Sequence, residues 1–228
     1  MTAIFENYES PWMDDELSIL RDAANRFFST EFVPHKDRWI EQGKVDRDAW
    51  HKAGEAGLLC AEIPAEYGGG GGDYRHETIV TEEQLGAGIS GFGNQVHSQI
   101  VAPYLLHYGN EEQKQKWLPK MATGEMVGAI AMTEPNTGSD LQNVKTSATK
   151  KGDSYVINGA KTYITNGIHA DLVVLVAKTD PNLGAKGISL IIVEANTMGF
   201  NKGRNLKKLG LNSGDTAELF FDDCVVPR

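Results

Sequence analysis

Cysteine is scarce in this chain of 228 residues, which contains only Cys60 and Cys224. The two lie far apart and form no CxxC pair, so the sequence predicts neither a disulfide framework nor a zinc site. The histidines are scattered and form no metal-ligand spacing with a partnering acid, and we expect no bound metal. A reducing compartment fits this usage, and we expect a cytoplasmic protein.

Positive charge and long apolar runs are also lacking. The 22 lysines and arginines are outnumbered by 31 acids, which gives a formal net charge of −9. Nucleic-acid binding requires a basic face, so this balance argues against it. The apolar run at 172–177 is far shorter than the roughly 20 residues that cross a bilayer, so no membrane span is expected. The acidic N-terminus predicts neither a secretory signal nor a transit peptide.

Several short motifs can be set aside. The five glycines from Gly68 to Gly72 follow no clear strand and have no dinucleotide-binding spacing, so they predict a mobile loop rather than a phosphate loop. The stretch at 159–162 resembles the end of a Walker loop, but Ala160 stands where that motif needs glycine. Ser139 lacks the second glycine of a nucleophile elbow, which makes it a poor nucleophile.

The first half of the chain has helical periodicity. From Asp14 the apolar residues Leu17, Leu20, Ala24 and Phe27 recur at steps of three and four residues, which predicts an amphipathic helix. Similar patterns predict further helices at 46–59, 74–87, 99–108 and 111–121. We therefore expect an all-α domain over residues 1–123.

From about residue 124 the pattern becomes that of strands. Short alternating runs are separated by the pairs Gly152–Asp153, Asn158–Gly159 and Asn166–Gly167, which are hairpin-turn signals. Three more apolar runs follow, each bounded by Gly, Pro, Asn or Asp. The sequence thus predicts an α+β protein, with a β-barrel or sandwich domain over residues 124–228 after the helical domain.

The stretch "AIAMTEPNTGSDL" at 129–141 combines a strand end with a polar turn. An extended segment exposes backbone groups, so Ile130, Met132 and Thr133 can meet the edge of a planar hydrogen-bonding ring. Beyond Pro135 the chain can turn and offer further donors through residues that include Gly138 and Ser139. The alternative is that this stretch and the one at 162–167 are ordinary loops.

The stretch "TYITNG" at 162–167 can supply a second wall for such a ring. Tyr163 and Thr165 are two residues apart, so both face the same side of a strand.

These stretches resemble the acyl-CoA dehydrogenase family. "AMTEPNTGSDL", "GDSYVINGAKTYITNG" and "KLGLNSGDTAELFFDDCVVP" are similar to its middle β domain. "YGGGGGD" and "YGNEEQKQKWLPKMATGE" are similar to its N-terminal helical domain, and the run at 199–221 is closest to the long-chain branch. The resemblance covers nearly the whole chain, with its motifs in order.

The resemblance implies an FAD enzyme that oxidises acyl-CoA thioesters to trans-2-enoyl-CoA. The segment from Ile130 to Ser139, including Gly138, is expected along the flavin and its ribityl chain, with Met132 and Thr133 at the pyrimidine edge. Tyr163, Ile164 and Thr165 are expected on its other side, where many members have Trp instead of this tyrosine. Ser139 is expected to face both the cofactor and the CoA part of the substrate.

The family has a C-terminal helical bundle that this sequence does not contain. Because that bundle carries the catalytic glutamate, we assign no catalytic residue here, and we interpret Glu134 as structural. The family also implies a homotetramer and an electron-transferring flavoprotein as electron acceptor. A basic cluster at 202–208 can attract CoA phosphates, although a solvated face is the simpler interpretation. Two alternatives stay open: a non-catalytic flavin or acyl-CoA binding module, and a flavin-dependent oxidase or monooxygenase.

Overall fold

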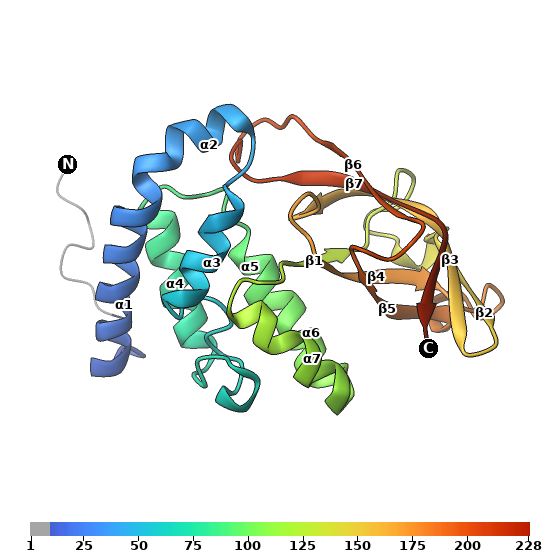
Figure 1. Cartoon of the computed structure of the whole chain (residues 1–228), viewed down its shortest axis with the longest axis horizontal. Coiled ribbons are helices and arrows are strands. Elements are labelled where there is room, and N and C mark those ends of the chain that lie inside the picture. Colours follow the sequence, from blue (N-terminus) through green and yellow to red (C-terminus); the bar gives the residue numbers. More distant parts are fainter. Residues whose placement is uncertain (1–9) are drawn as a thin grey trace.

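The computed structural model describes residues 10–228. Helices from the first half of the chain lie together on the left of Figure 1, and the strands lie together on the right. The helices are α1 (Asp15–Phe27), α2 (Lys36–Gln42), α3 (Arg47–Glu55), α4 (Tyr74–Gly86), α5 (Asn94–Val96), α6 (Ala102–Tyr108) and α7 (Glu111–Ala122). Short π-helical turns at Phe28–Phe32 and His97–Val101 precede α2 and α6.

Side-chain caps begin three of these helices close to the predicted positions. Asp14 accepts a hydrogen bond from the Leu17 amide at the start of α1. Asp73 and Asn110 form capping boxes at the starts of α4 and α7. A capping side chain satisfies amide groups that have no partner within the helix, so these residues fix where each helix begins.

The helical half has an aromatic core. The rings of Phe28, Phe32, Trp39, Trp50 and Phe92 are all buried. Several pack edge to face; the Phe32 and Phe92 centroids, for example, are 5.1 Å apart with an interplanar angle of 88°. This arrangement favours contact between a ring edge and a ring face, and it joins the π-helical turn after α1 to α2 and α3.

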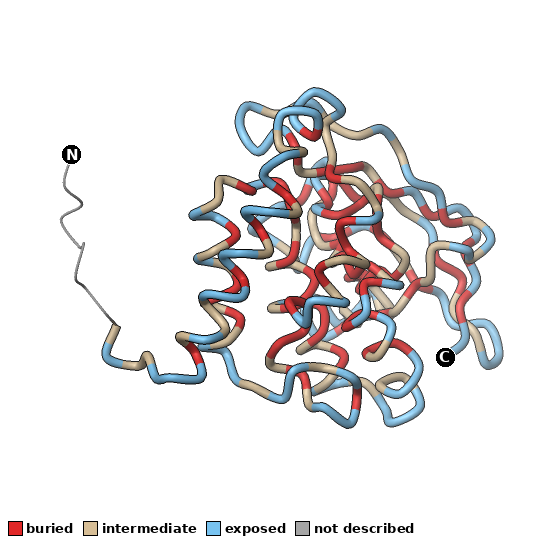
Figure 2. The backbone as a smooth tube through the Cα atoms, turned by 60° about the vertical axis from the view of Figure 1, so that its left-hand side comes forward, coloured by how far each residue is buried: buried red, intermediate tan, exposed pale blue. Residues whose placement is uncertain are grey.

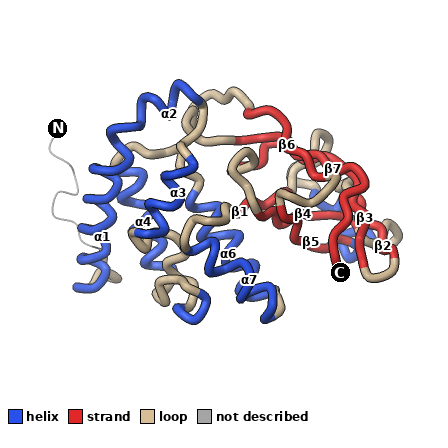
Figure 3. Tube along the Cα trace, viewed as in Figure 1, coloured by secondary structure: helices blue, strands red, loops and turns tan. Residues whose placement is uncertain are grey.

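The strands of the second half form one curled sheet, with helices confined largely to the first half (Figure 3). Its members are β1 (Gly128–Ala131), β2 (Ser147–Lys151), β3 (Ser154–Thr165), β4 (Leu172–Lys178), β5 (Ile188–Glu194), β6 (Phe200–Asn205) and β7 (Thr216–Pro227). They pair in the order β1-β4-β2-β3-β7-β6, and β5 pairs with β4. β1 and β4 run parallel, with Gly128 opposite Leu172. The predicted α+β class is confirmed.

Two of the three predicted hairpin turns are wrong. Gly152 and Asp153 do connect β2 to β3, where Lys151 pairs with Ser154. Asn158–Gly159, by contrast, lies inside β3, where the pairing with β7 shifts register at a bulge. An Asn-Gly pair supports positive φ, and here it serves a bulge instead of a turn, as the φ of +154° at Gly159 indicates. Asn166–Gly167 forms a turn, but it leads to β4, which does not pair with β3.

The strand β4 is buried on both faces. Val173, Leu175 and Ala177 pack into the core of the sheet. Leu172 and Val174 point the other way, into a cluster with α6 and α7. This explains the unbroken apolar run in the sequence, because a strand covered on both sides needs no polar positions. Buried segments are accordingly continuous across the middle of the molecule in Figure 2.

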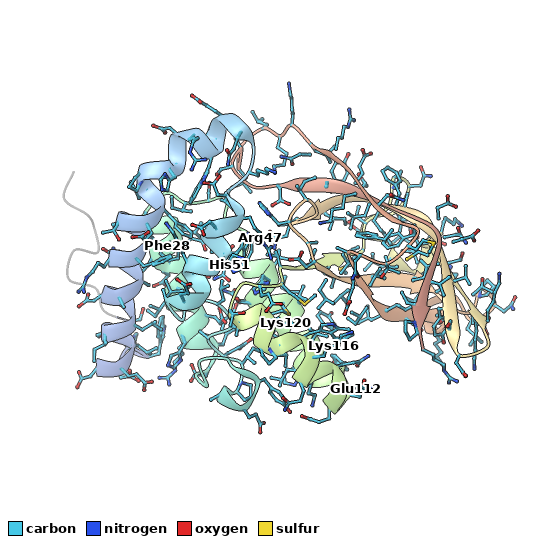
Figure 4. All side chains as sticks on the ribbon, viewed as in Figure 1. Phe28, Arg47, His51, Glu112, Lys116 and Lys120 are labelled. Atoms are coloured by element: carbon cyan, nitrogen blue, oxygen red, sulfur yellow. The ribbon has the colours of Figure 1, made fainter. Side chains whose placement is uncertain are left out.

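Hydrogen bonds and an ion pair also connect the helical half to the sheet. Arg47, on α3, lies between the helices and the sheet in Figure 4. Its guanidinium donates to the backbone oxygens of Gly124 and Glu125 and pairs with Asp171 at 2.8 Å. His169 donates from Nε2 to the Val45 oxygen at 3.0 Å. These contacts tie the chain before β1 and the start of β4 to the helical half.

Asn166 makes the most central of these connections. Its Nδ2 donates to the Gly93 oxygen at 2.9 Å and to the Gly128 oxygen at 3.1 Å. His97 fixes the same strand start, because the Gly128 amide donates to its Nδ1 at 2.9 Å. A Cβ on Gly93 would lie 1.9 Å from Asn166 Oδ1, so only glycine permits this approach.

The glycine run at 68–72 forms a loop, as predicted, but backbone hydrogen bonds attach the loop to the segment at 60–63. The Gly70, Gly71 and Gly72 amides donate to backbone oxygens of Cys60, Ile63 and Ala61. A Cβ on Gly69 would meet the Ile63 oxygen at 2.2 Å. The glycines therefore allow close backbone packing, which contradicts the prediction of a mobile loop.

Within residues 10–228 no helix is long and apolar enough to cross a membrane. The interpretation of the N-terminal segment as neither signal nor transit peptide falls largely on residues 1–9, which lie outside the described part.

Glu77 on α4 gives the fold a testable pH dependence. Desolvation raises the pKa of this buried carboxyl from 4.5 to about 7. Between these values the folded protein holds a proton that the unfolded chain has released, so stability falls as pH rises. We expect Glu77→Gln to be more stable than the parent by up to about 3 kcal/mol at pH 8, with the difference vanishing near pH 4.5.

Urea unfolding at several pH values between 4.5 and 8 measures this difference. Glu112→Gln is the matched control, since Glu112 is an exposed glutamate on α7 (Figure 4). A stability difference for Glu77→Gln that does not change with pH contradicts the prediction.

Candidate functional site

The predicted segment after β1 forms a tight turn. The Glu134 amide donates to the Thr137 oxygen at 2.8 Å, and the Thr137 amide donates back to the Glu134 oxygen at 3.1 Å. Pro135 and Asn136 are exposed at its tip. This turn ends the extended stretch and redirects the chain, as proline at the second position of a turn favours.

The residues before the turn are attached to β3. The Thr162 amide donates to the Thr133 oxygen at 2.9 Å. Lys161 Nζ donates to the Met132 oxygen at 2.9 Å and to Glu134 Oε1 at the same distance. Met132 and Thr133 are therefore held directly beside the strand that carries the second predicted segment.

Glu134 is buried, and both of its carboxylate oxygens accept hydrogen bonds within the protein. Its carboxylate accepts bonds from the amides of Lys145 and Thr146 in addition to Lys161. Desolvation raises its pKa, but these hydrogen bonds outweigh that effect and hold the pKa below its ordinary value. The contacts support the interpretation of Glu134 as structural.

Lys161 was missed by the sequence analysis. Lys161 is two residues from Tyr163, so strand alternation predicts an outward side chain. The side chain is instead fully buried, next to the shift of register that follows it, and the sequence carried no signal for this burial. Such a lysine requires an acid or carbonyl groups close by.

The end of β3 presents two side chains outward. Tyr163 is 69% exposed and Thr165 is also exposed, whereas Ile164 between them is buried in the core of the sheet. A second shift of register separates Lys161 from Ile164 in the pairing with β7. Tyr163 has a φ of +59°, which is rare for a residue with a large side chain. The strand is thus distorted where it presents the tyrosine.

The remaining predicted site residues differ in how far they are buried. Ile130 is half-buried in β1 and packs against the cluster shared by β4, α6 and α7. Gly138 and Ser139 are exposed beyond the turn. Among residues 10–228, neither of these two forms a hydrogen bond to β3. The structure brings Met132 and Thr133 beside 161–165, and leaves Gly138 and Ser139 on the far side of the turn.

Unused backbone donors make this surface suited to a planar heteroaromatic ring. Within the described part of the chain, the amides of Met132 and Thr133 donate to no other group. An exposed phenol and an exposed hydroxyl stand on the neighbouring strand, at Tyr163 and Thr165. Donors, an aromatic wall and a hydroxyl are the groups that a flavin ring needs, so these residues fit FAD.

The site is an open face of this chain. A cavity of about 580 Å³ lies elsewhere, between α7 and β5, and includes Tyr104, Trp117 and Leu190 in its lining. None of the predicted site residues lines it. A ring bound at Tyr163 therefore contacts this chain on one side and requires cover from another part of the protein or another subunit.

The basic cluster at 202–208 is partly engaged in contacts within the β domain. Lys202 donates to the Ile168 oxygen and Lys208 to Thr216 Oγ1, so half of the basic cluster is engaged inside the β domain. Arg204 lies near Glu218, at 3.6 Å. Over residues 10–228 no group of three His, Cys, Asp or Glu side chains is placed to hold a metal ion.

Two protein-family models match the chain. The model described as "Acyl-CoA dehydrogenase, N-terminal domain" matches residues 14–125. The model described as "Acyl-CoA dehydrogenase, middle domain" matches residues 129–224.

Individual relatives agree with these models. The long-chain specific acyl-CoA dehydrogenase of Sus scrofa mitochondria is 47% identical over 214 residues, which cover 93% of this chain and 50% of that protein. The acyl-CoA dehydrogenase of Geobacillus kaustophilus is 48% identical with a TM-score of 0.93, covering 96% of this chain and 58% of that one. A glutaryl-CoA dehydrogenase of Mycobacterium smegmatis, solved in complex with FADH2, is 30% identical with a TM-score of 0.87 and covers 94% and 54%.

The chain spans about half the length of the curated relatives it matches. Both halves of the fold, the helical domain and the curled sheet, are accounted for by consecutive domains of one family. The chain belongs to the acyl-CoA dehydrogenase family.

Proposed function

We propose that this chain is the flavin-binding portion of an FAD-dependent acyl-CoA dehydrogenase, which converts acyl-CoA thioesters to trans-2-enoyl-CoA. The observation that carries the proposal is the exposed pair Tyr163 and Thr165 beside the unpaired amides of Met132 and Thr133. Membership of the family and the solved relative in complex with FADH2 support the choice of cofactor.

Each residue has a distinct part in the proposed site. The amides of Met132 and Thr133 hold the polar edge of the ring, and Tyr163 covers one side of it. The Thr165 hydroxyl donates to a ring nitrogen. Ile130 and Ile164 contribute backbone, because their side chains pack inward. Gly138 and Ser139 border the ribityl chain, and Ser139 also meets the CoA part of the substrate.

The reaction divides between the cofactor and the protein. When bound, FAD would supply the acceptor for the hydride that leaves the β carbon of the substrate. This chain orients the ring through its amides and Thr165 and excludes water from one side of it. We assign no catalytic base among residues 1–228, because Glu134 is committed to Lys161. The base is expected in the C-terminal helical domain of the family.

We also propose domain boundaries for this chain, and a location, an oligomeric state and an electron acceptor for the complete enzyme. We propose that the helical domain covers residues 1–123 and the β domain residues 124–228. The complete enzyme is proposed to be a cytoplasmic homotetramer in fatty-acid β-oxidation that passes electrons to an electron-transferring flavoprotein. Acyl chain length stays open, because the similar proteins include both long-chain and glutaryl-CoA dehydrogenases.

Flavin binding tests the proposal directly. We expect the purified chain, after FAD is added, to retain an oxidised-flavin absorption spectrum through gel filtration. Thr165→Ala removes one hydrogen-bond donor, so it should weaken FAD affinity by about tenfold without unfolding the protein. Thr149→Ala is the control, because Thr149 is an exposed threonine on β2. Equal affinities in Thr165→Ala and the parent would remove Thr165 from the site.

The strained backbone of Tyr163 gives a second test. Asparagine adopts positive φ more easily than tyrosine, so Tyr163→Asn should raise the free energy of unfolding by about 1 kcal/mol. It should also lower FAD affinity about fivefold, because the aromatic wall is lost. Thermal unfolding and fluorescence titration measure the two effects.

Tyr108→Asn is the control, since Tyr108 is an exposed tyrosine in α6 without positive φ. It should give neither the gain in stability nor the loss in affinity. A destabilised Tyr163→Asn protein contradicts the strain argument.

The absence of an assigned catalytic base in this chain gives a third test. Because no carboxylate in this chain is assigned to the α carbon, an acyl-CoA should not bleach the visible absorption band of the flavin-loaded chain. Anaerobic titration with acyl-CoA thioesters of several lengths measures this. Stoichiometric bleaching would point to a base within residues 1–228, whereas binding without bleaching is the expected result.

A further inference from the structure

Lys161 is an unusual residue in the sheet. It lies on β3, and its side chain is fully buried. Its ammonium has two neighbours, the Met132 oxygen and Glu134 Oε1, each at 2.9 Å. Desolvation lowers the pKa of Lys161, while the Glu134 carboxylate opposes this effect. Burying an ion pair in this way costs more than filling the same space with an apolar side chain of equal length. A function in addition to stability is therefore worth seeking.

The carboxylate partner is itself fixed. Glu134 accepts backbone bonds from Lys145 at 2.6 Å and Thr146 at 2.9 Å, in addition to the bond from Lys161. The ammonium consequently has a defined position. It can donate to the Met132 oxygen only with the backbone of 132–134 in its observed place.

The bond to the Met132 oxygen determines the direction of the next amide. A trans peptide group is planar, and its C=O and N–H point in opposite directions. The described residues contain no cis peptide bond. Because the Met132 oxygen points to Lys161, the Thr133 N–H points away from it. That amide donates to no other group within residues 10–228.

The same bond strengthens this donor. A charged donor on a carbonyl oxygen draws electron density through the peptide group, and hydrogen bonds in such a chain reinforce one another. The Thr133 N–H is thus both oriented and polarised by a side chain on the other strand.

We propose that Lys161 is a positioning residue for the flavin, acting through the Met132–Thr133 peptide group. This inference rests on the proposed function, because it assigns the Thr133 amide, which points away from Lys161, to the polar edge of the ring. A stronger donor at that edge binds the ring more tightly. It also stabilises the electron-rich reduced ring, so Lys161 raises the reduction potential of the bound flavin.

The test must separate this role from stability. Lys161→Met alone leaves Glu134 as an unpaired buried charge and is expected to destabilise the fold. The decisive protein is the double variant Lys161→Met/Glu134→Gln, in which both charges are removed. A glutamine offers one acceptor oxygen, so the amide of Lys145 or Thr146 loses its partner and a moderate loss of stability is expected. The folded variant should bind FAD about tenfold more weakly and hold the flavin at a lower potential.

Lys208→Met provides the matched control. Lys208 also donates to a backbone oxygen and a side-chain oxygen of the β domain, those of Gly214 and Thr216. This variant should keep parental FAD affinity and potential. A stable double variant with parental affinity and potential overturns the proposal, and so does an equal loss of affinity in Lys208→Met.

A separate measurement distinguishes this proposal from the proposed function. The amide nitrogen resonance of Thr133 reports the hydrogen bond on the Met132 oxygen in protein without flavin. It should shift in the double variant relative to Glu134→Gln alone, which controls for the substitution beside Thr133, and stay unchanged in Lys208→Met. If the parent binds no FAD, the proposed function fails for this chain. An unchanged Thr133 resonance would then overturn the role of Lys161 independently.

Discussion

One side-chain amide holds the architecture together. Asn166 donates to a carbonyl of the helical half, at Gly93, and to a carbonyl of the first strand, at Gly128. The Gly128 acceptor is buried and the Gly93 acceptor is partly buried, so both would be costly to leave unpaired. The contact lies one residue beyond Thr165, so the relative placement of helices and sheet also sets the end of β3. Arg47, from the helical side, and His169, from the segment before β4, secure the same junction.

The helical half was largely predictable because its signals are local. Apolar spacing and capping residues such as Asp14 and Asn110 act within a few neighbours, so sequence alone placed α1, α4 and α7 closely. The β half depends on partners far away along the chain. Asn158–Gly159 has the composition of a hairpin turn, yet the long pairing of β3 with β7 continues through it as a bulge. The preference of Asn-Gly for a turn is outweighed there by the backbone hydrogen bonds that β3 makes with β7 on both sides of the bulge.

In the proposed site, too, the features set by neighbouring residues were predictable, and those set by distant contacts were not. A strand end followed by a polar turn is visible in the sequence, and so is the alternation that sends Tyr163 and Thr165 to one face. Lys161 could not be recognised, because its role depends on a carbonyl and a carboxylate that only the folded chain brings together. The left-handed backbone of Tyr163 has no sequence signal either, since tyrosine rarely adopts it.

The parallel pairing of β1 with β4 has a consequence for how the protein folds. The β2–β3 hairpin lies between these strands in sequence, so it can close early through its short turn. The contact of β1 with β4 bridges a longer loop, whose closure costs entropy before any contact compensates for it. The Met132–Thr133 stretch follows β1 directly, so the contact of β1 with β4 fixes where this stretch lies. A cofactor that binds there would recognise finished molecules and draw the folding equilibrium toward them.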